Sequence, residues 1–515
     1  MRIALFLNAK LGTFEAEIIE YILNSSNLEL ILIFIDARES LYSNYILDFQ
    51  KRVEKRLFKL ECKKSIDLSG IERVYIKPNR YKDYDIIDDE LSLQIASYHI
   101  DLIINLSSNL LKGKFLNYLK YGVLNVVFDS GLNSNFASLY SIIKKYRLIQ
   151  ADIVLQNSNR FFLIDRVYIN RNFSFVKSNY TIKHESAISL IKYIELIDNL
   201  NADVYNSNFT NIYPKFSDVF RYFVNFYSTF VNKVYKRVSY KLFKSRYDCW
   251  SLFVGKGDIF SSSFDLIKLK PKKDQFWADP FIYKKDGQIY IFFENYSYSK
   301  DIGKISCGRL DKDRLVDIED VLVKDYHLSY PFLFEDNGQL FMIPECSENR
   351  RLEVYKCVKF PNEWELYSVA FEGEILFDST IYRDKDGNLW LFTNKQTSNC
   401  GSVDAKLYIY KIDSLKLKEI LPHKKNPVII NSGIGRNGGA IFEKNGKIYR
   451  PSQANVDGVY GRYLNINEIK TLNLNEYQEE VIKVINPTFD RGLISLHHLH
   501  QLDDIFIVDS AYKKI

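Results

Sequence analysis

The sequence predicts two domains of different class, an α/β domain and an all-β domain, joined by a helical segment. Strand-like and helix-like segments alternate through residues 1–200, apolar residues recur at helical spacing within 201–247, and a strand–turn–strand phrase recurs five times within 248–515. The chain has 515 residues, 46% of them hydrophobic, which is enough length and apolar content for two or three domains with cores of their own.

The alternation in residues 1–200 is typical of a doubly wound, mostly parallel sheet. Residues 28–36 are almost continuously apolar, as expected of a strand that is buried on both faces. The patterns predict strands at 2–8, 28–36, 101–106, 122–128 and 152–156, and helices at 15–23, 45–60, 110–120 and 137–147.

A sheet of this kind binds ligands beyond the carboxyl ends of its strands, here at residues 8–13 and 128–136. The first of these loops lacks the G-x-G-x-x-G pattern of dinucleotide-binding turns, and no G-x-x-x-x-G-K-[ST] is present. We therefore expect no cofactor in this domain.

The stretch DLIINLSSNLLKGKFLNYLKYGVLNVVFDSG, residues 101–131, resembles the formyltransferase family. In that family an Asn, a His and an Asp serve as the acyl-transfer residues. Asn105 lies near the place of the family's Asn, but Val127 and Phe128 occupy the strand end where the family has its His. Without an imidazole there is no obvious general base. The resemblance implies a formyltransferase-like fold that has lost formyl transfer; another doubly wound domain is the alternative.

Residues 201–247 predict a basic amphipathic helix between the two domains. Its basic residues gather toward its C-terminal end: Lys233, Lys236, Arg237, Lys241, Lys244 and Arg246. Its apolar residues recur at helical spacing: Phe220, Phe223, Tyr227, Val231, Val234, Val238 and Leu242. In one interpretation these apolar residues dock on one or both domains. In the other, residues 216–246 bind the surface of an anionic bilayer.

The repeated phrase in residues 248–515 predicts a five-bladed β-propeller. Each copy is an apolar strand, a turn and a second apolar strand, and the copies begin at Ala278, Ser329, Asp378, Gly438 and Leu496. The turns of the first four copies are Asp-Gly or Asn-Gly, which supply the positive φ angles of a two-residue hairpin turn. Copies begin about 50 to 60 residues apart, the spacing of propeller blades or similar arrays.

Alignment of the five copies places Asp279, Tyr330, Asp378, Gly439 and His497 at about the same inner position. In a propeller such positions converge on the central axis, so we expect Asp279 and Asp378 to face a common pocket. Glycoside chemistry needs paired carboxyl groups of this kind, one to accept a proton and one to donate it.

Other side chains are candidates for holding the substrate. Trp277 lies beside Asp279 as a sugar platform, and Glu294 and Glu345 end the second strands of the first two copies. These two glutamates reach the channel rim or, alternatively, pair with nearby Arg350 or Arg351. The substrate-binding candidates are Trp277, Glu294, His327, Tyr330, Arg350, Arg436, Arg450, Gln453 and His497.

The histidines near the starts of the copies raise the alternative of a metal site. In the H-H-x-H run, His497 points to the opposite face of a strand from His498 and His500. We therefore expect hydrogen bonds to sugar or phosphate, and no metal. Arg436 and Arg450 present rigid donor forks for a phosphate or a sugar carboxylate, with a surface salt bridge as the alternative for Arg450.

The phrase WADPF, residues 277–281, resembles family 43 of the glycoside hydrolases, which are five-bladed propellers. The resemblance implies that Asp279 is the catalytic base and Asp378 the residue that orients and tunes. The family's acid is a Glu on the fourth blade, where this chain has Gly438 and Gly439. Glu345 is therefore our candidate for the acid.

Most of residues 250–515 also resembles the N-terminal domain of glucosamine inositolphosphorylceramide transferases, and bacterial relatives join this domain to a formyltransferase-like one. The phrases that carry the resemblance are WADPF, HLSYPF with IPE, FDST with LWLFT, and YRPSQ. They imply a carbohydrate-active protein of surface polysaccharide or glycoconjugate synthesis, acting by glycosyl transfer or a related sugar modification. A non-catalytic glycan-binding scaffold and a glycosidase of the family 43 type are the alternatives.

Composition narrows the partners and the location. A net charge of +6 over 515 residues gives no nucleic-acid footprint, so we expect a sugar nucleotide, a glycan or a lipid-linked glycan as partner. The six cysteines form no C-x-x-C pair, and the apolar run in MRIALFLNAK is too short for a signal peptide. We expect a cytoplasmic protein, with peripheral contact at the inner membrane surface if the helix binds lipid.

Overall fold

The computed structural model describes the chain except residues 10, 39–43, 61–65, 82–83, 108, 130–135, 159, 200–202, 206–212, 244–246, 262–264, 400 and 515. Lys244 and Arg246 of the expected helix lie outside the described residues, as do residues 130–135 of the expected ligand mouth. The chain divides into two compact units, Met1–Val231 and Asn232–Ile515.

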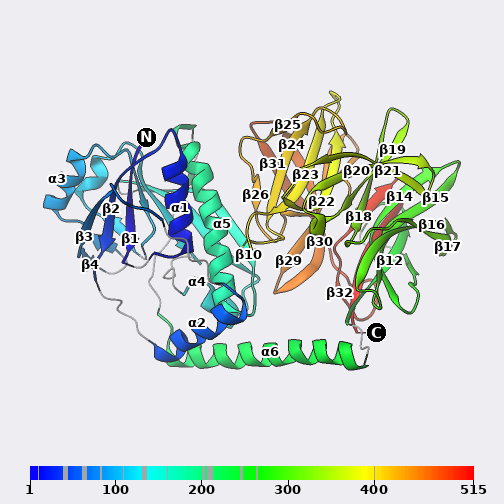
Figure 1. Ribbon diagram of the computed structural model, residues 1–515, viewed down its shortest axis with the longest axis horizontal. Coiled ribbons are helices and arrows are strands. Elements are labelled where there is room, and N and C mark those ends of the chain that lie inside the picture. The colour runs from blue at the N-terminus through cyan, green and yellow to red at the C-terminus, as the bar shows by residue number, and fades with distance from the viewer. Residues whose placement is uncertain are drawn as a thin grey trace. The chain divides into compact units, whose positions relative to one another are not determined.

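The first unit is built on an eight-stranded sheet in the order β11-β10-β9-β8-β6-β1-β2-β3 (Figure 1). Strands β8, β6, β1, β2 and β3 run parallel, whereas β9, β10 and β11 join antiparallel. The strands are β1 Arg2–Asn8, β2 Glu29–Asp36, β3 Glu72–Ile76, β6 Leu102–Asn105, β8 Gly122–Phe128, β9 Leu148–Asn157, β10 Arg160–Asn170 and β11 Asp203–Val204. The helices are α1 Thr13–Asn24, α2 Tyr45–Leu57, α3 Asp89–Ser97, α4 Ala137–Ile143, α5 Phe175–Glu195 and the short η2 Ile197–Asn199.

Apolar clusters cover both faces of this sheet. On β1, Ile3, Leu5 and Leu7 pack in one cluster with residues of α1 and α5, whereas Ala4 and Phe6 pack in another with residues of α3 and η1. Side chains alternate across a strand, so one apolar strand serves two cores. The doubly wound α/β arrangement is confirmed. The formyltransferase-like identity stays a prediction, and a formyl-transfer assay, in which we expect no product, tests the loss of that chemistry.

The predicted helix at 110–120 is wrong, because this segment joins a second, small sheet. Gly113 divides it, and a Cβ at this position would meet the backbone oxygen of Ile87 at 2.6 Å, so only glycine allows the approach. The partner strand comes from elsewhere in the chain, which local apolar spacing does not reveal. The elements here are β4 Asn79–Tyr81, β5 Tyr84–Ile86, β7 Leu110–Lys112 and the 3₁₀ turn η1 Lys114–Asn117, with the sheet in the order β4-β5-β7.

The helix expected between the domains is α6 (Phe216–Phe243), and the boundary between the two units falls inside it. Its buried residues in the first unit are Val219, Tyr222 and Phe226. The Tyr222 hydroxyl donates to the Glu54 carboxylate at 2.6 Å. This face therefore docks, but it is not the predicted one: Phe223 of the predicted set is half-buried, and the others are exposed, namely Phe220, Tyr227, Val231, Val234, Val238 and Leu242.

The second unit consists of five antiparallel sheets of four or five strands. Each copy of the repeated phrase lies in a different sheet, as the sequence predicts. Four of the five sheets are each built from consecutive strands. One contains β14 Gln275–Lys285, β15 Gln288–Ser297, β16 Ile302–Asp311 and β17 Arg314–Leu322, and the next contains β18 Ser329–Asp336, β19 Gln339–Glu345, β20 Leu352–Lys359 and β21 Glu363–Ala370. The third contains β22 Ile375–Arg383, β23 Leu389–Gln396, β24 Lys406–Ile412, β25 Ile420–Pro422 and β26 Ile429–Ile430, and the fourth contains β27 Arg436–Asn437, β28 Phe442–Lys444, β29 Lys447–Val456, β30 Val459–Leu472 and β31 Tyr477–Ile485. A 3₁₀ turn, η3 Ser347–Asn349, follows β19.

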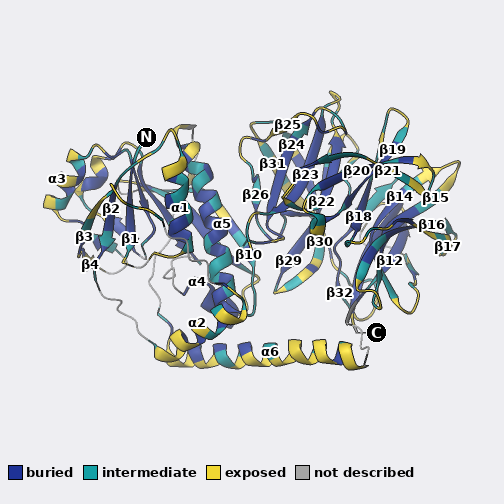
Figure 2. Ribbon diagram, viewed as in Figure 1, coloured by how far each residue is buried: buried dark blue, intermediate teal, exposed yellow. Residues whose placement is uncertain are grey.

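The fifth sheet closes the unit into a ring. It combines β12 Tyr247–Lys256 and β13 Leu266–Leu269 with β32 Leu493–Ser495, β33 Leu499–Leu502 and β34 Ile505–Lys514. Successive sheets contact each other through β14 and β18, β18 and β22, β22 and β27, β30 and β32, and β34 and β14. Figure 2 shows the buried residues along these strands. The topology is that of a five-bladed propeller, as predicted.

Among the described residues, no helix combines the length and apolar character needed to cross a membrane. Cys249, Cys307, Cys346 and Cys357 are buried free thiols. Cys62 and Cys400 lie outside the described residues.

Candidate functional site

The inner position of the repeat has an unusual backbone. Asp279, Tyr330 and Asp378 have φ angles of 50°, 44° and 43°, and Gly439 has 139°. The first three also interrupt the pairing of their hairpins with a bulge. A bulge re-aims a side chain, and a left-handed non-glycine residue persists only where its surroundings hold it. Three of the five aligned positions thus share one backbone conformation.

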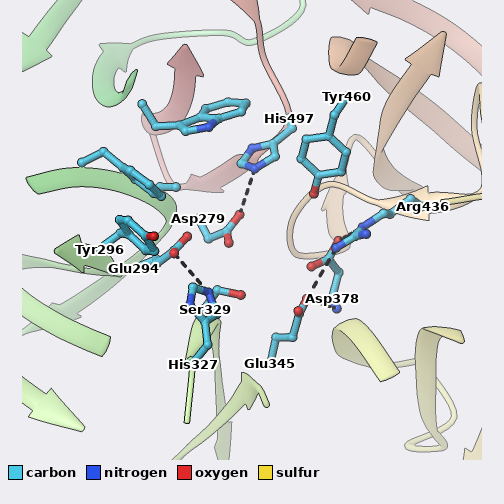
Figure 3. Close-up of a pocket in the computed structure, with 13 residues that line it drawn as sticks. Asp279, Glu294, Tyr296, His327, Ser329, Glu345, Asp378, Arg436, Tyr460 and His497 are labelled. Atoms are coloured by element: carbon cyan, nitrogen blue, oxygen red, sulfur yellow. Dashed lines mark hydrogen bonds and ion pairs between the residues drawn. The ribbon is translucent and has the colours of Figure 1, made fainter. Parts of the chain in front are cut away.

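Figure 3 shows the cavity on which these blades converge, with a volume of about 280 Å³. Seven of the predicted site residues line it: Asp279, Glu294, His327, Glu345, Asp378, Arg436 and His497. Six further residues complete the lining: Trp250, Phe276, Ala278, Tyr296, Ser329 and Tyr460. Asp279 and Asp378 therefore share one pocket, as the repeat predicts.

On one side of the pocket, His497 lies between two aspartates. Its Nδ1 contacts the Asp509 carboxylate at 2.8 Å, and its Nε2 lies 3.7 Å from Oδ1 of Asp279. Burial opposes the charged imidazolium, but Asp509 and Asp279 outweigh it and raise the pKa of His497 to about 9. Burial also raises the pKa of Asp279 well above its usual range, against the charge of His497. A positive imidazolium thus adjoins a carboxyl group whose proton affinity is increased by burial.

On another side, Arg436 bridges two carboxyl groups. Its Nε lies 2.6 Å from Oδ2 of Asp378, and its Nη2 lies 3.5 Å from Oε2 of Glu345. Burial, and then the negative charge of Asp378, raise the pKa of Glu345 to about 8, although Arg436 opposes the change. Two carboxyl groups that share a site do not both ionise readily. Glu345 therefore retains its proton at neutral pH.

A third pair consists of Glu294 and His327. Oε1 of Glu294 lies 3.3 Å from Nε2 of His327, whose Nδ1 accepts a hydrogen bond from the backbone N–H of Gly303 at 3.0 Å. Burial opposes protonation of His327, but the contact with Glu294 outweighs it and raises the pKa of the imidazole. A Cβ on Gly303 would meet Cε1 of His327 at 2.6 Å, so this glycine makes room for the ring.

Aromatic rings complete the walls of the pocket. Trp250 stacks on His497 with ring centroids 4.0 Å apart, and Phe276 stacks on Tyr296 at 4.6 Å. The Tyr460 ring meets His497 edge-on at 5.4 Å. Apolar walls with a few convergent polar groups are the usual composition of small-molecule pockets.

Five of the predicted binding residues lie outside the pocket lining: Trp277, Tyr330, Arg350, Arg450 and Gln453. Trp277 is buried against Phe293 at 4.9 Å, because alternation along β14 turns it away from Phe276 and Ala278. Arg350 is exposed and donates to the backbone oxygen of Gly373 at 2.7 Å.

Tyr330 and Arg450 form contacts with other parts of the propeller and do not line the pocket. The Tyr330 hydroxyl accepts a hydrogen bond from the backbone N–H of Gly439 at 3.1 Å, which spans from the second repeat to the fourth. Arg450 is fully buried and forms a two-pronged contact with Glu479 at 2.8 and 2.6 Å. The alternative of a surface salt bridge for Arg450 is therefore wrong, because its contact with Glu479 is buried.

Gln453 also lies outside the lining but supports it from behind. Its side-chain amide donates to Oδ2 of Asp378 at 2.9 Å and to the backbone oxygen of Asn437 at 2.8 Å. The Asp378 carboxylate is therefore fixed by an arginine and an amide. Gln453 acts on the pocket through Asp378 and does not face the cavity.

Pairing across the hairpins gives a signal for lining residues that the sequence analysis did not name. Phe276 pairs across the hairpin with Tyr296, and Ala278 pairs with Glu294. Ser329 pairs with Glu345 in the next blade. Cross-strand partners share one face of a sheet, so assigning Glu294 and Glu345 to the pocket also assigned their partners. Trp250 comes from the sheet that closes the ring, before the first repeat, and the repeat alone gives no signal for it.

Asp279, His497 and Asp509 form the one group among the described residues whose potential ligand atoms all lie within 4.8 Å of each other. The Asp509 carboxylate already accepts from the backbone N–H groups of Asp279, His497 and His498, and it contacts the His497 ring. Hydrogen bonds within the fold thus occupy this carboxylate. The expectation of no metal stays a prediction.

Comparison with known proteins finds similarity in the second unit, over the region that contains the phrases noted in the sequence. The family described as glucosamine inositolphosphorylceramide transferase 1, N-terminal, matches residues 267–505. Proteins named glucosamine inositolphosphorylceramide transferase 1 from Oryza sativa subsp. japonica and from Arabidopsis thaliana are each 35% identical over 208 residues, 40% of this chain and 27% of each relative. The chain thus matches about a quarter of the length of these relatives.

Among solved structures, similar chains include a GH43 β-xylosidase/α-arabinofuranosidase from a compost microbial metagenome, at 14% identity, TM-score 0.35, and coverage of 49% of this chain and 89% of that one. An exo-β-1,3-galactanase from Phanerochaete chrysosporium has 11% identity and TM-score 0.35, covering 51% of this chain and 64% of that one.

Proposed function

We propose that this protein is carbohydrate-active and that the propeller pocket transfers or cleaves a glycosyl group during glycoconjugate or surface polysaccharide synthesis. The observation that carries the proposal is that Glu345, whose pKa is raised by burial to about 8, shares one cavity of about 280 Å³ with Asp279. A proton donor and a proton acceptor around one cavity are what the exchange of a glycosidic bond requires.

In this mechanism Glu345 is the acid and Asp279 the base. Asp279 takes the proton from the attacking hydroxyl, whose oxygen forms a bond to the anomeric carbon. Glu345 gives its proton to the leaving oxygen as the old glycosidic bond breaks. If the attacking hydroxyl belongs to another sugar or a lipid headgroup, the result is transfer; if it belongs to water, the result is hydrolysis. Asp378 and Arg436 orient Glu345 through the contacts described above.

Two further features support a sugar substrate. The stacked pairs Trp250–His497 and Phe276–Tyr296 offer flat apolar surfaces beside carboxyl groups, which suits a sugar ring that is apolar on its faces and polar on its rim. The relatives are named glucosamine inositolphosphorylceramide transferases, and that name joins an amino sugar to a lipid. We infer that the partner of this pocket is a sugar nucleotide, a glycan or a lipid-linked glycan.

Asp279→Asn tests the assignment, with Asp286→Asn as the matched control. Asp286 lies in the same blade, is exposed, and has the same φ of 50°, so both changes remove one carboxylate from a left-handed residue. We expect Asp279→Asn to lower turnover of activated glycosides or sugar nucleotides by roughly 10²- to 10⁴-fold. Sugar binding should persist, and Asp286→Asn should match the wild type. Unchanged turnover in Asp279→Asn would show that the assignment is wrong.

A second candidate function is non-catalytic glycan binding. Arg436 contacts both Asp378 and Glu345, an arrangement that also suits a rigid binding pocket. The same experiment separates the two functions: a wild-type protein that binds glycans but turns over no activated sugar is a binding scaffold.

A further inference from the structure

A second stripe of apolar side chains runs along α6, on the side away from its buried residues. Figure 2 shows the exposed residues along this helix. Nine apolar residues, here called the α6 stripe, are between 42% and 69% exposed: Phe216, Phe220, Val224, Tyr227, Val231, Val234, Tyr235, Val238 and Leu242. At 3.6 residues per turn, all nine fall within an arc of roughly 100°. The stripe extends along the whole length of the helix.

The docked side of α6 does not use these residues. Val219, Tyr222 and Phe226 are 1%, 0% and 1% exposed, and they lie on the other side of the helix from the stripe. Tyr222 is held by hydrogen bonds with Glu54 and with the backbone of Phe175. The helix is thus fixed to the first unit by one face, and its other face is exposed.

Basic residues flank the stripe. Arg221 and Lys241 lie about 80° to either side of Val231 around the helix axis, at the two edges of the stripe. Lys233, Lys236 and Arg237 lie farther from the stripe around the helix axis. The one acidic residue of α6 is Asp218. Five basic residues and one acidic residue give α6 a formal charge of +4.

We propose that the α6 stripe binds the surface of an anionic membrane, with the helix lying in the plane of the interface. Apolar and aromatic side chains on such a helix enter the boundary between headgroups and acyl chains. Arginine and lysine at the stripe's edges extend their charged ends to lipid phosphates while their stems cover apolar surface. This inference is independent of the chemistry of the propeller pocket.

A second copy of this chain is the other occupant to consider. Phe220, Val224, Tyr227, Val231, Val234 and Val238 follow the alternating four- and three-residue spacing of a coiled coil. Pairing two such helices would bring two charges of +4 together, and like charges at flanking positions destabilise coiled coils. The same charge attracts an anionic lipid surface, so complementarity favours the membrane.

The test compares the full chain with two single substitutions in vesicle flotation. Val231→Asp places a carboxylate at the centre of the stripe, and Asn232→Asp places one on the next residue, which is also exposed but lies off the stripe. The vesicles are phosphatidylcholine alone, or phosphatidylcholine with about a third of phosphatidylserine. Circular dichroism and the melting temperature check that each variant is folded.

We expect the wild type and Asn232→Asp to float with the anionic vesicles, and binding to fall as salt is raised. Val231→Asp should reduce the bound fraction by roughly tenfold, because a carboxylate at the centre of the stripe must enter the apolar boundary. Absence of binding to anionic vesicles, equal binding to both vesicle types, or equal binding by Val231→Asp would each overturn the proposal. A concentration-dependent dimer that Val231→Asp dissolves, without vesicle binding, would assign the stripe to a second copy.

Discussion

Glu345 keeps its proton in a place where an exposed glutamate would lose it. Burial and the neighbouring Asp378 favour the neutral carboxyl group, and the positive charge of Arg436 only partly offsets them. A general acid works best when its pKa lies near the working pH, and a value of about 8 meets that condition. Asp378, fixed by Arg436 and Gln453, therefore adds to the effect of burial in raising the proton affinity of Glu345.

The raised pKa of Glu345 predicts an alkaline limit of activity. The acid must be protonated to donate, so turnover should fall as the pH rises through about 8. Glu345→Gln, which cannot donate a proton, should reduce turnover by roughly 10²- to 10⁴-fold at all pH values. The measurement is turnover of an activated glycoside or sugar nucleotide between pH 5 and pH 10 in buffers of constant ionic strength.

Glu335→Gln is the matched control for this profile, because Glu335 lies in the same blade and is exposed. Glu335→Gln should give the same dependence of turnover on pH as the wild type. If Glu345→Gln retains both the activity and the alkaline limb, Glu345 is not the acid.

At the scale of elements, a buried ion pair ties the fourth repeat together. Arg450 on β29 reaches Glu479 on β31, past the intervening strand β30, and both side chains are at most 3% exposed. Removing one partner of such a pair leaves the other as an uncompensated buried charge. Arg450→Ala should therefore lower the free energy of unfolding by about 3–5 kcal/mol, as measured by chemical denaturation of the second unit.

Arg309→Ala provides the comparison for this ion pair. Arg309 pairs with Asp317 at 2.7 Å, but these side chains are 33% and 69% exposed. Loss of this ion pair should lower the free energy of unfolding by less than about 1 kcal/mol, because water screens the pair. Equal effects of the two arginine substitutions would contradict the difference that burial is expected to make.

The sequence predicted elements well where the signal was local. The five hairpins followed from turn residues and apolar strands, and three pocket residues, Asp279, Asp378 and His497, followed from aligning them. Contacts made by distant segments gave no such signal. The predicted helix at 110–120 became a strand because β5 pairs with it, and Trp250 entered the pocket because β12 pairs with β34. Trp277 was misplaced because proximity to Asp279 in sequence was given more weight than the alternation of faces along β14.

At the scale of the whole propeller, Tyr330 joins opposite parts of the ring. Its hydroxyl accepts the backbone N–H of Gly439, and its side chain is fully buried. Tyr330→Phe keeps the ring of the side chain but leaves this buried donor without its acceptor. We expect a loss of about 1–3 kcal/mol in the free energy of unfolding.

Tyr75→Phe is the control for the tyrosine substitution, since Tyr75 is 66% exposed on the first unit. A surface change of this kind should alter the free energy of unfolding by no more than about 0.5 kcal/mol. A Tyr330→Phe protein as stable as this control would mean that the contact across the axis contributes nothing.

The closing sheet has a consequence for biosynthesis. Trp250 and His497 stack in the pocket, yet one lies on β12, which pairs with β34, and the other precedes β34 by a few residues. Domains generally fold as units and in order during translation, so the first unit can form while ribosomes are still making the rest. The pocket cannot, because its wall depends on β34, which is made after the other described strands of the propeller. A nascent chain stalled before β34 would thus carry a folded amino-terminal unit and an incomplete pocket.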